Sequence, residues 1–231
     1  MSTPAVGWTV ERRRVVRTAL GIGTATGAYG VSFGALSTAS GLTVTQTCAL
    51  SVLVFTGASQ FALVGVLGAG GSAGSGAATA LLLGSRNALY GLRLAPLLEL
   101  RGVRRLVGAQ LVIDESTAVA VAQAEPRAAR LGFWTAGLAV YVLWNAATLI
   151  GALAGDAIGD TRAYGLDAAV PAAFLALVAP RLRGREPWAV ALAAAAIALL
   201  AVPVVPVGAP VLLAALVAIV AGVRPDPGGT R

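Results

Sequence analysis

The sequence predicts an all-α protein, a polytopic bundle of seven or eight transmembrane helices. Of its 231 residues, 57% are hydrophobic, and the mean hydropathy is +0.82. Only 12% are charged, whereas an ordinary soluble domain carries roughly 25%. Apolar stretches of about 20 residues, the length that a helix needs to cross the hydrocarbon core, recur along the chain. Composition and segment length together therefore favour a helical membrane protein.

The charged and sulfur-containing residues exclude several kinds of site. All 17 basic residues are arginine, and with 10 acidic residues they give a net charge of +7. The arginines lie in short clusters between apolar stretches, without interleaved aromatic residues, so we expect anionic lipid headgroups and not nucleic acid as their partner. Histidine is absent and Cys48 is the single cysteine, which excludes an intrachain disulfide and the common zinc sites. We expect no metal and no cofactor.

The chain divides into a basic N-terminal segment at 1–17, a single transmembrane domain at 18–223 and a short polar tail at 224–231. The basic start superficially resembles a signal peptide, but the apolar stretch that follows it is too long and many further spans come after it. The eight expected spans are 18–40, 46–68, 77–98, 106–123, 133–155, 166–180, 187–204 and 207–223. The last two flank a proline-containing hinge and form either a tight hairpin or one broken element, so the count stays at seven or eight.

The arginines in the connections predict the orientation. With eight spans, eleven arginines lie on the side of the N-terminus and four on the other side. The positive-inside rule then places the N-terminus in the cytoplasm. The cluster formed by Arg101, Arg104 and Arg105 is the exception, because this count puts it on the outer side.

The first span carries a stripe of glycines. Their spacings of four, three and four residues place them on one face of a helix. A smooth face of this kind lets another helix approach closely. The stripe either serves packing alone or forms a face that slides or opens. Its members are Gly23, Gly27, Gly30 and Gly34.

The second span places small residues and an amide in the middle of a helix rich in leucine and valine. Gly57 and Gly65, with Ser59 and Gln60 between them, would permit local unwinding. Unwound backbone at membrane depth is tolerated where it lines a cavity or is buried in protein. The alternative is an unbroken helix in which Gln60 binds a neighbouring helix. The sequence leaves both open.

The third span contains two arginines. Arg86, Tyr90 and Arg93 are spaced at i, i+4 and i+7 and therefore share one face. Arg93 lies close enough to the following loop to reach the headgroups, but Arg86 lies near the middle of the span. An unpaired charge at this depth costs at least about 2.5–3.5 kcal/mol. We therefore expect Arg86 to have an acidic partner.

The fourth span supplies that partner. Asp114 and Glu115, followed by Ser116, fall near its centre, and an antiparallel turn brings them beside the third span. Gln110, Asp114 and Thr117 share a face while Glu115 is turned about 100° away, so one acid pairs with Arg86 and the other stays free. Which acid pairs is left open, and so is a purely architectural role for the pair.

The later spans contain few polar side chains. In the fifth, Asn145 and Thr148 form a polar notch beside Trp144, for which we expect hydrogen bonds between helices. The last three spans are almost wholly apolar and are expected to be either lipid-facing scaffold or a docking surface. No internal repeat is apparent.

Three motifs, Gly57-Ala-Ser-Gln-Phe61, Arg86-Asn-Ala-Leu-Tyr-Gly-Leu92 and Asp114-Glu-Ser116, resemble the AzlC family in their order and spacing. The resemblance runs along nearly the whole chain from about Leu20. It implies the larger subunit of an exporter of valine, leucine, isoleucine or their analogues, which works with a small membrane subunit, AzlD. We expect a multi-pass protein of the inner or plasma membrane of a prokaryote. Because no nucleotide-binding motif is present, we expect coupling to the proton gradient.

A zwitterionic substrate needs an anion for its ammonium group, donors for its carboxylate and an apolar pocket for its tail. We expect Asp114 or Glu115 to bind the ammonium group, and Arg86 or freed backbone N–H groups near Gly57 to bind the carboxylate. Asn87 stands where the family commonly has histidine, so a histidine proton relay is in question and the acids would carry the proton. The expected substrate and proton pathway is Gly57, Ser59, Gln60, Arg86, Asn87, Tyr90, Asp114, Glu115 and Ser116.

Two alternatives come from other classes. Gly57-Ala-Ser59 faintly resembles the nucleophile turn of an intramembrane hydrolase, but a serine nucleophile needs a base and the chain has no histidine. The two acids are adjacent in one helix and point apart, so they form no facing dyad. We therefore expect no enzymatic activity. The other alternative is a non-conducting subunit needed only for assembly of a membrane complex.

Overall fold

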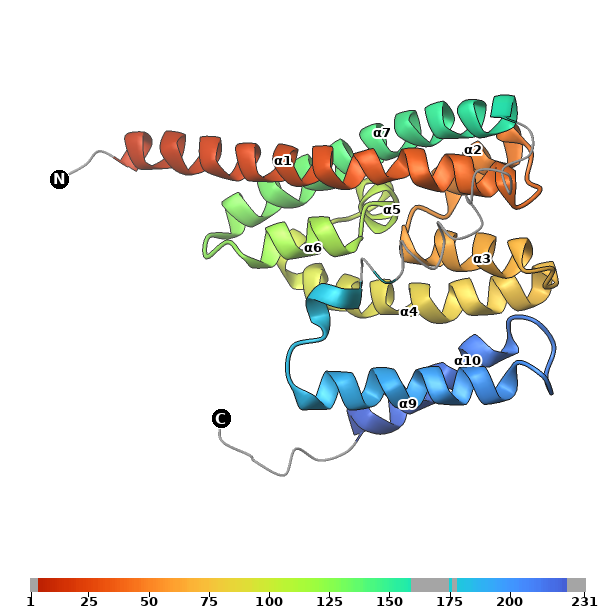
Figure 1. Cartoon of the computed structure of the whole chain (residues 1–231). Coiled ribbons are helices and arrows are strands. Elements are labelled where there is room, and N and C mark those ends of the chain that lie inside the picture. The colour runs from red at the N-terminus through yellow and green to blue at the C-terminus, as the bar shows by residue number, and fades with distance from the viewer. Residues whose placement is uncertain (1–3, 159–174, 176–177, 224–231) are drawn as a thin grey trace.

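The computed structural model describes residues 4–158, 175 and 178–223, and these residues form helices and turns without a strand (Figure 1). The all-α prediction is confirmed. A 3₁₀ turn at Ala179–Arg181 precedes α9. The α-helices are α1 (Pro4–Ala39), α2 (Val44–Leu53), α3 (Ala58–Gly68), α4 (Ala73–Leu98), α5 (Val103–Gln110), α6 (Asp114–Val121), α7 (Pro126–Ile158), α9 (Arg185–Ala201) and α10 (Ala209–Val223).

Within the described part of the chain, α7 alone is long and apolar enough to cross a membrane on length and composition. Helices α1 and α4 are 36 and 26 residues long, but small polar residues and arginines lower their hydropathy. Helices α2 and α3 are apolar but have only 10 and 11 residues. The expected span 166–180 falls mostly outside the described residues.

The expected span at 46–68 is not one continuous helix, so of the two alternatives left open for it the unbroken helix is wrong. Helix α2 ends at Leu53, the chain turns through residues 54–57, and α3 begins at Ala58. The end of α3 returns to where α2 began, because a Cβ built on Gly68 would lie 2.7 Å from Ser40 Oγ. Helices α2 and α3 therefore form a hairpin that enters the bundle and leaves at the same end. We call residues 44–68 hairpin 1.

The expected continuous helix at 106–123 is wrong for the same reason. Helix α5 ends at Gln110 and α6 begins at Asp114. Along α7, Gly132 packs against Val119, and Gly137, further into the bundle, packs against Leu111. The turn therefore lies deeper than the end of α6. We call residues 103–121 hairpin 2, and it enters from the end opposite to hairpin 1 (Figure 1).

Helices α1 and α7 form the longest contact in the bundle and run parallel. A Cβ built on Gly23 would lie 2.6 Å from Ala139 Cβ, and one on Gly27 would lie 2.5 Å from Leu143 Cβ. Further along, Gly30 and Gly34 lie against backbone carbonyls of α7. The stripe thus brings the two helix backbones together, as small residues do between membrane helices.

The chain contains a structural repeat that the sequence did not reveal. Helix α1 is followed by hairpin 1, and α4, which runs in the opposite direction, is followed by hairpin 2 (Figure 1). Helix α3 packs mainly on α4, and α6 packs mainly on α7. The two units are therefore related by inverted topology, an arrangement that recurs in transporters.

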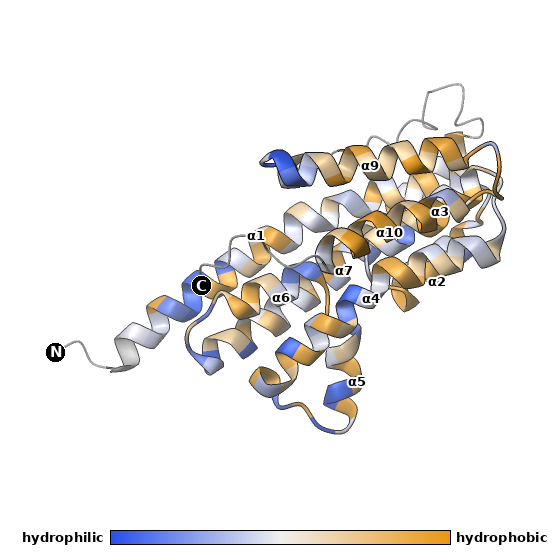
Figure 2. Ribbon diagram, turned by 90° about the horizontal axis from the view of Figure 1, so that it is seen from below, coloured by the Kyte–Doolittle hydropathy of each residue, from blue (hydrophilic) through white to orange (hydrophobic). Residues whose placement is uncertain are grey.

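Most arginines of the described residues gather at one end of the bundle, where Figure 2 shows most of the hydrophilic colour. Arg127, in the first turn of α7, lies 4.2 Å over the ring of Trp8 of α1. Arg130 forms an ion pair with Glu99, just after α4. The start of α5 follows Glu99 directly, so its cluster Arg101–Arg105 lies at this same end. The sequence-based count puts this cluster on the side opposite to the N-terminus because it counts hairpin 1 as a crossing, whereas hairpin 1 returns to the end at which it enters.

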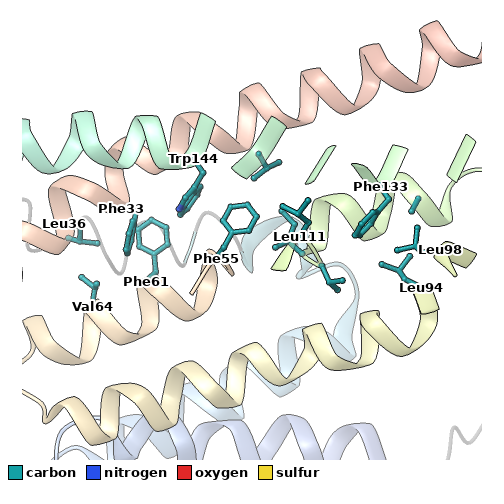
Figure 3. Close-up of a cluster of buried hydrophobic side chains, with 14 residues drawn as sticks. Phe33, Leu36, Phe55, Phe61, Val64, Leu94, Leu98, Leu111, Phe133 and Trp144 are labelled. Atoms are coloured by element: carbon teal, nitrogen blue, oxygen red, sulfur yellow. The ribbon is translucent and has the colours of Figure 1, made fainter. Parts of the chain in front are cut away.

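Helices α9 and α10 form an antiparallel pair, which resolves the two alternatives for the proline hinge in favour of a hairpin. The pair touches the rest of the bundle at one end, where a Cβ on Gly208 would lie 2.8 Å from Ser75 Cβ of α4. The larger core lies elsewhere, around the inner ends of the two hairpins (Figure 3). There, Phe33 makes an edge contact with Phe61 at 5.6 Å and stacks on Trp144 at 5.9 Å.

Candidate functional site

The inner end of hairpin 1 is built around Gln60. Gly57 has φ +54°, a backbone conformation that side chains rarely adopt, and its N–H donates to Gln60 Oε1 at 3.1 Å. Gln60 Nε2 donates to the carbonyl of Leu50 at 3.1 Å, and the side chain is fully buried. Gln60 therefore satisfies backbone groups that the break in the helix exposes. Of the two interpretations of this segment, local unwinding is confirmed.

The inner end of hairpin 2 uses the same device with a different side chain. Ser116 is the third residue of α6, as Gln60 is of α3, and its Oγ accepts from the N–H of Ile113 at 3.1 Å. The same hydroxyl donates to the carbonyl of Leu111 at 2.6 Å. The two ends are also joined to each other, because Gln110 Nε2 donates to the carbonyl of Val52 at 2.8 Å.

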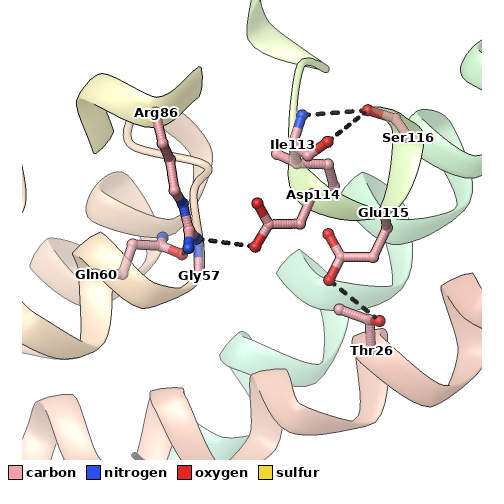
Figure 4. Close-up of polar contacts among 8 residues, drawn as sticks. All are labelled: Thr26, Gly57, Gln60, Arg86, Ile113, Asp114, Glu115 and Ser116. Carbon is pink, nitrogen blue, oxygen red and sulfur yellow. Dashed lines mark hydrogen bonds and ion pairs between the residues drawn. The ribbon is translucent and has the colours of Figure 1, made fainter. Parts of the chain in front are cut away.

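Arg86 of α4 pairs with Asp114, with 3.0 Å between Nη2 and Oδ2 (Figure 4). Both side chains are about one-third exposed, at 32% and 30%. The expected acidic partner is therefore Asp114, but the expected mid-helix position of this acid is wrong. Asp114 is the first residue of α6, where the helix dipole favours a negative charge. The break also separates Gln110 from the face expected to hold Asp114 and Thr117.

Glu115 takes a separate partner. Its Oε1 accepts a long hydrogen bond of 3.5 Å from Thr26 Oγ1 of α1 (Figure 4). The two acids thus point to different helices, as their 100° offset predicted. Asp114 faces α4 and Glu115 faces α1, so the end of hairpin 2 connects both long helices.

A cavity of about 290 Å³ lies between the two hairpin ends. Residues of α1, α4 and α7 line its remaining sides. Its lining combines the charged group just described with apolar and aromatic side chains, as ligand sites do. Its polar and aromatic lining residues include Thr26, Tyr29, Phe55, Thr56, Phe61, Arg86, Asn87, Asp114, Glu115 and Trp144.

Five of the expected pathway residues line this cavity: Gly57, Arg86, Asn87, Asp114 and Glu115. Gln60 and Ser116 do not line it and instead hold the two turns together. Ser59 lines a second cavity on the other side of the hairpin ends, and Tyr90 packs against the apolar core.

Several buried polar atoms around the cavity have no hydrogen-bond partner among the described residues. They are Arg86 Nε, Trp144 Nε1, Thr56 Oγ1 and Asp114 Oδ1. A buried polar group without a partner costs about 1–3 kcal/mol, so a ligand that supplies partners is stabilised there. The first two atoms are donors, and the last is an acceptor when the carboxylate is ionised.

Sequence reasoning missed Thr26, Tyr29 and Thr56 as lining residues and noted Trp144 only as a neighbour of the polar notch. Thr26 and Tyr29 lie among the glycines of the first span, where the glycine stripe was the stronger pattern. In the notch itself, Ser51 Oγ of α2 donates to Thr148 Oγ1 of α7 at 3.3 Å, so this hydrogen bond between helices is confirmed. Asn145 instead donates to the carbonyl of Tyr141 within α7.

The described residues contain no cluster of three or more acidic, cysteine or histidine side chains that could hold a metal ion. The broken helices of the two hairpins meet around a charged cavity inside an apolar bundle. Broken helices whose turns line such a cavity occur in helical membrane proteins.

Residues 21–158, more than half of the chain, match the AzlC protein family, and the chain belongs to that family. The family is a transporter family linked to branched-chain amino acids, not a family of enzymes. The chain is also 34% identical over 157 residues to a protein described as an uncharacterized membrane protein from Archaeoglobus fulgidus; the match covers 67% of this chain and 68% of that protein. No solved structure matches. The family match spans both hairpins and ends with α7, so it includes the whole candidate site.

Proposed function

We propose that the chain is the transport subunit of an exporter of branched-chain amino acids, namely valine, leucine, isoleucine or their analogues. It works by proton-coupled secondary transport together with a small AzlD-like membrane subunit. The observation that carries the proposal is the cavity between the hairpin ends, where a partly buried arginine, two carboxylates and unpartnered polar atoms surround a space of about 290 Å³.

The polar groups of the cavity complement a zwitterion. The ammonium group binds the carboxylates of Asp114 and Glu115 at the end of hairpin 2. The carboxylate binds the donors Arg86 Nε and Trp144 Nε1 and the N-terminus of α3, where backbone N–H groups and the helix dipole favour an anion. The aliphatic tail contacts the apolar part of the lining, which includes Phe55 and Val140.

The proton is carried by the acids at the start of α6. Asn87 lines the cavity at the position where the family commonly has histidine, and an amide does not titrate. Protonation of Asp114 or Glu115 removes the negative charge that holds the ammonium group, so the substrate is released. Deprotonation restores the site for the next cycle.

In the membrane, α1, α4, α7, α9 and α10 cross the bilayer, and the two hairpins enter it from opposite sides without crossing. This arrangement replaces two of the seven or eight expected spans. The arginines at the end where α1 and α7 begin support a cytoplasmic location for that end. Backbone at the hairpin ends is not helical, and at membrane depth such backbone must be buried in protein or line a cavity.

The test is efflux of labelled valine, leucine, isoleucine and methionine from cells that express the chain with and without its small partner. Asp114→Asn and Glu115→Gln are expected to abolish export or its dependence on the proton gradient. The matched control is Glu99→Gln, because Glu99 also pairs with an arginine but is 67% exposed at the end of the bundle. Export that is unchanged in both site variants contradicts the proposal, and so does export by the partner alone.

A further inference from the structure

We propose that hairpin 1 and hairpin 2 are two oppositely directed gates over the cavity, and that Gln110 is the positioning residue that holds them together in the described state. The inference rests on the proposed transport function. The inference goes beyond that function because it names the two hairpins as the moving parts and Gln110 as the contact between them.

Both hairpin ends reach the same level of α4. A Cβ built on Gly84 would lie 3.3 Å from Ser59 Oγ of hairpin 1. Two residues further along α4, Arg86 pairs with Asp114 of hairpin 2. This level is the middle of α4, which runs from Ala73 to Leu98. Each hairpin therefore extends halfway into the bundle, one from each end.

Each turn is held by its own side chain, so that each hairpin can move as a unit. Gln60 bonds to Gly57 and Leu50 within hairpin 1. Ser116 bonds to Ile113 and Leu111 within hairpin 2. Movement of one hairpin relative to the other leaves these internal bonds intact.

The bond between the hairpins is of a different kind. Gln110 Nε2 lies 2.8 Å from the carbonyl of Val52 and 3.4 Å from that of Leu53, the last residues of α2. The last carbonyls of a helix have no partner within the helix, so Gln110 supplies one across the interface. A single side-chain hydrogen bond contributes little net free energy, which suits a contact that opens and closes.

A second cavity of about 740 Å³ lies on the far side of this contact, between α2, α3, α4 and α5. Gln110, Leu53 and Ser59 line it. Phe55, Thr56 and Asn87 line both cavities, so the end of hairpin 1 and one turn of α4 form the wall between them. Separation of the hairpin ends therefore joins the two cavities and opens the charged site.

The inverted arrangement gives the motion a direction. Displacement of hairpin 1 opens the charged cavity towards the end where α2 begins, and displacement of hairpin 2 opens it towards the end rich in arginine. When both ends are in contact through Gln110, the charged cavity and the second cavity stay separate. Rocking of inverted repeats around a fixed site is a general way to achieve alternating access.

The experiment measures how fast a buried reporter thiol is modified. Ser59 Oγ is buried and unpartnered, and the residue is 1% exposed, so Ser59→Cys in a Cys48→Ser background supplies a near-isosteric reporter. A membrane-impermeant thiol reagent is applied from each side to the full chain in membranes. Gln110→Leu is expected to raise the modification rate several-fold from at least one side.

The matched control is Gln123→Leu. Gln123 Nε2 donates to the carbonyl of Val119 at 3.0 Å, so it makes the same kind of bond as Gln110 but stays beside hairpin 2. Its loss is expected to leave the rate unchanged. Equal rates in the two variants, whether both raised or both unchanged, overturn the proposal. If Gln110→Leu does not accumulate, Gln110→Met and Gln123→Met, which keep an unbranched side chain, are compared in the same way.

Labelling does not depend on the substrate, so the two proposals fail separately. A raised rate in Gln110→Leu with no amino acid efflux from the parent chain overturns the transport proposal alone. Efflux that requires the acids, with no effect of Gln110→Leu on labelling, overturns the gates alone.

Discussion

The α1–α7 interface and the meeting point of the hairpins are held together in opposite ways. In the first, glycines bring two helix backbones into contact along several turns, and a Cβ on Gly27 would lie 2.5 Å from Leu143 Cβ. In the second, individual side-chain hydrogen bonds from Gln60, Ser116 and Gln110 hold short helices whose ends leave buried polar atoms unpartnered.

The difference indicates that the α1–α7 interface supports the fold, whereas the hairpin ends carry the function. Close backbone packing cannot move by small steps without losing many contacts at once, so α1 and α7 form a stable frame. The hairpin ends combine charge, unwound backbone and single hydrogen bonds, which can exchange partners with a ligand. If this contrast is correct, substitutions in the two regions should fail for different physical reasons.

The largest effect is expected at the frame. A Cβ at Gly34 would meet the carbonyl of Thr148, and one at Gly151 would meet the carbonyl of Val31, both inside van der Waals contact. Overpacking costs about 1–3 kcal/mol and occasionally more, and here the obstructing atoms are backbone, so we expect Gly34→Ala and Gly151→Ala at or above the upper value. Thermal unfolding of the purified protein measures the loss.

Gly21→Ala is the control for the frame, because a Cβ there meets nothing within 4 Å. Alanine is favoured over glycine inside a helix by about 0.5–1 kcal/mol, so this variant should be as stable as the parent or more so. Equal destabilisation by Gly21→Ala and Gly34→Ala would contradict a frame built on backbone contact.

The second effect concerns the ion pair at the hairpin ends. Arg86→Gln leaves the partly buried Asp114 without its partner beside the cavity, and the loss of one partner of such a group costs about 1–3 kcal/mol. Since about 1.4 kcal/mol corresponds to a factor of ten, we expect export to fall by about tenfold or more. Arg130→Gln breaks a pair whose members are 44% and 67% exposed, worth about 0–1 kcal/mol, and should leave export nearly unchanged. Similar export in both variants would remove the distinction between the site and the surface.

The sequence predicted the helical class, the long helices and the pairing of Arg86 with an acid. These conclusions follow from hydropathy, helical spacing and the cost of an isolated charge, which are all local or pairwise. It also predicted that Gly57 and Gln60 could break their helix. The glycine positions of the first span were visible, although their partner helix was not.

The two hairpins could not be predicted because an apolar stretch of about 20 residues has the length of a crossing whether or not it turns back. Reversal at Leu111–Ile113 depends on Ser116 capping the following helix, and a serine in this position has no distinctive spacing. The inverted repeat was hidden because Gln60 and Ser116 perform the same task with different chemistry. Trp144 was missed because its place beside the cavity depends on the packing of α7 against α1.

The third effect concerns the buried cap of hairpin 1. Gln60→Leu leaves the N–H of Gly57 without its partner, at about 1–3 kcal/mol, and removes the second of two hydrogen bonds to the carbonyl of Leu50, which keeps the N–H of Val54. Gln46 is the matched control, because its Oε1 accepts from the N–H of Thr43 at 2.9 Å in the same capping arrangement, but on an exposed residue that water can replace. The thermal unfolding temperature should therefore fall much further in Gln60→Leu than in Gln46→Leu. An equal fall in the unfolding temperature of the two variants would show that the stability of hairpin 1 does not depend on the burial of the Gln60 cap.

The smallest effect is expected at Gly57. Replacing it with alanine adds a single methyl group, as Gly34→Ala does at the frame. The nearest atom to a Cβ at Gly57 is Trp144 Cη2 at 4.0 Å, so there is room for alanine, unlike at Gly34. The cost comes from the backbone alone, because φ +54° with ψ −85° is a sparsely populated conformation that costs a residue with a side chain about 1–3 kcal/mol. Gly57→Ala should therefore fold with a modest loss of thermal stability, while Gly91→Ala, in open space on α4, should show none. Because the strain is relieved if the turn changes conformation, we expect Gly57→Ala to alter export more than its stability suggests. Unchanged export at a reduced unfolding temperature would show that the geometry of this turn serves only the fold.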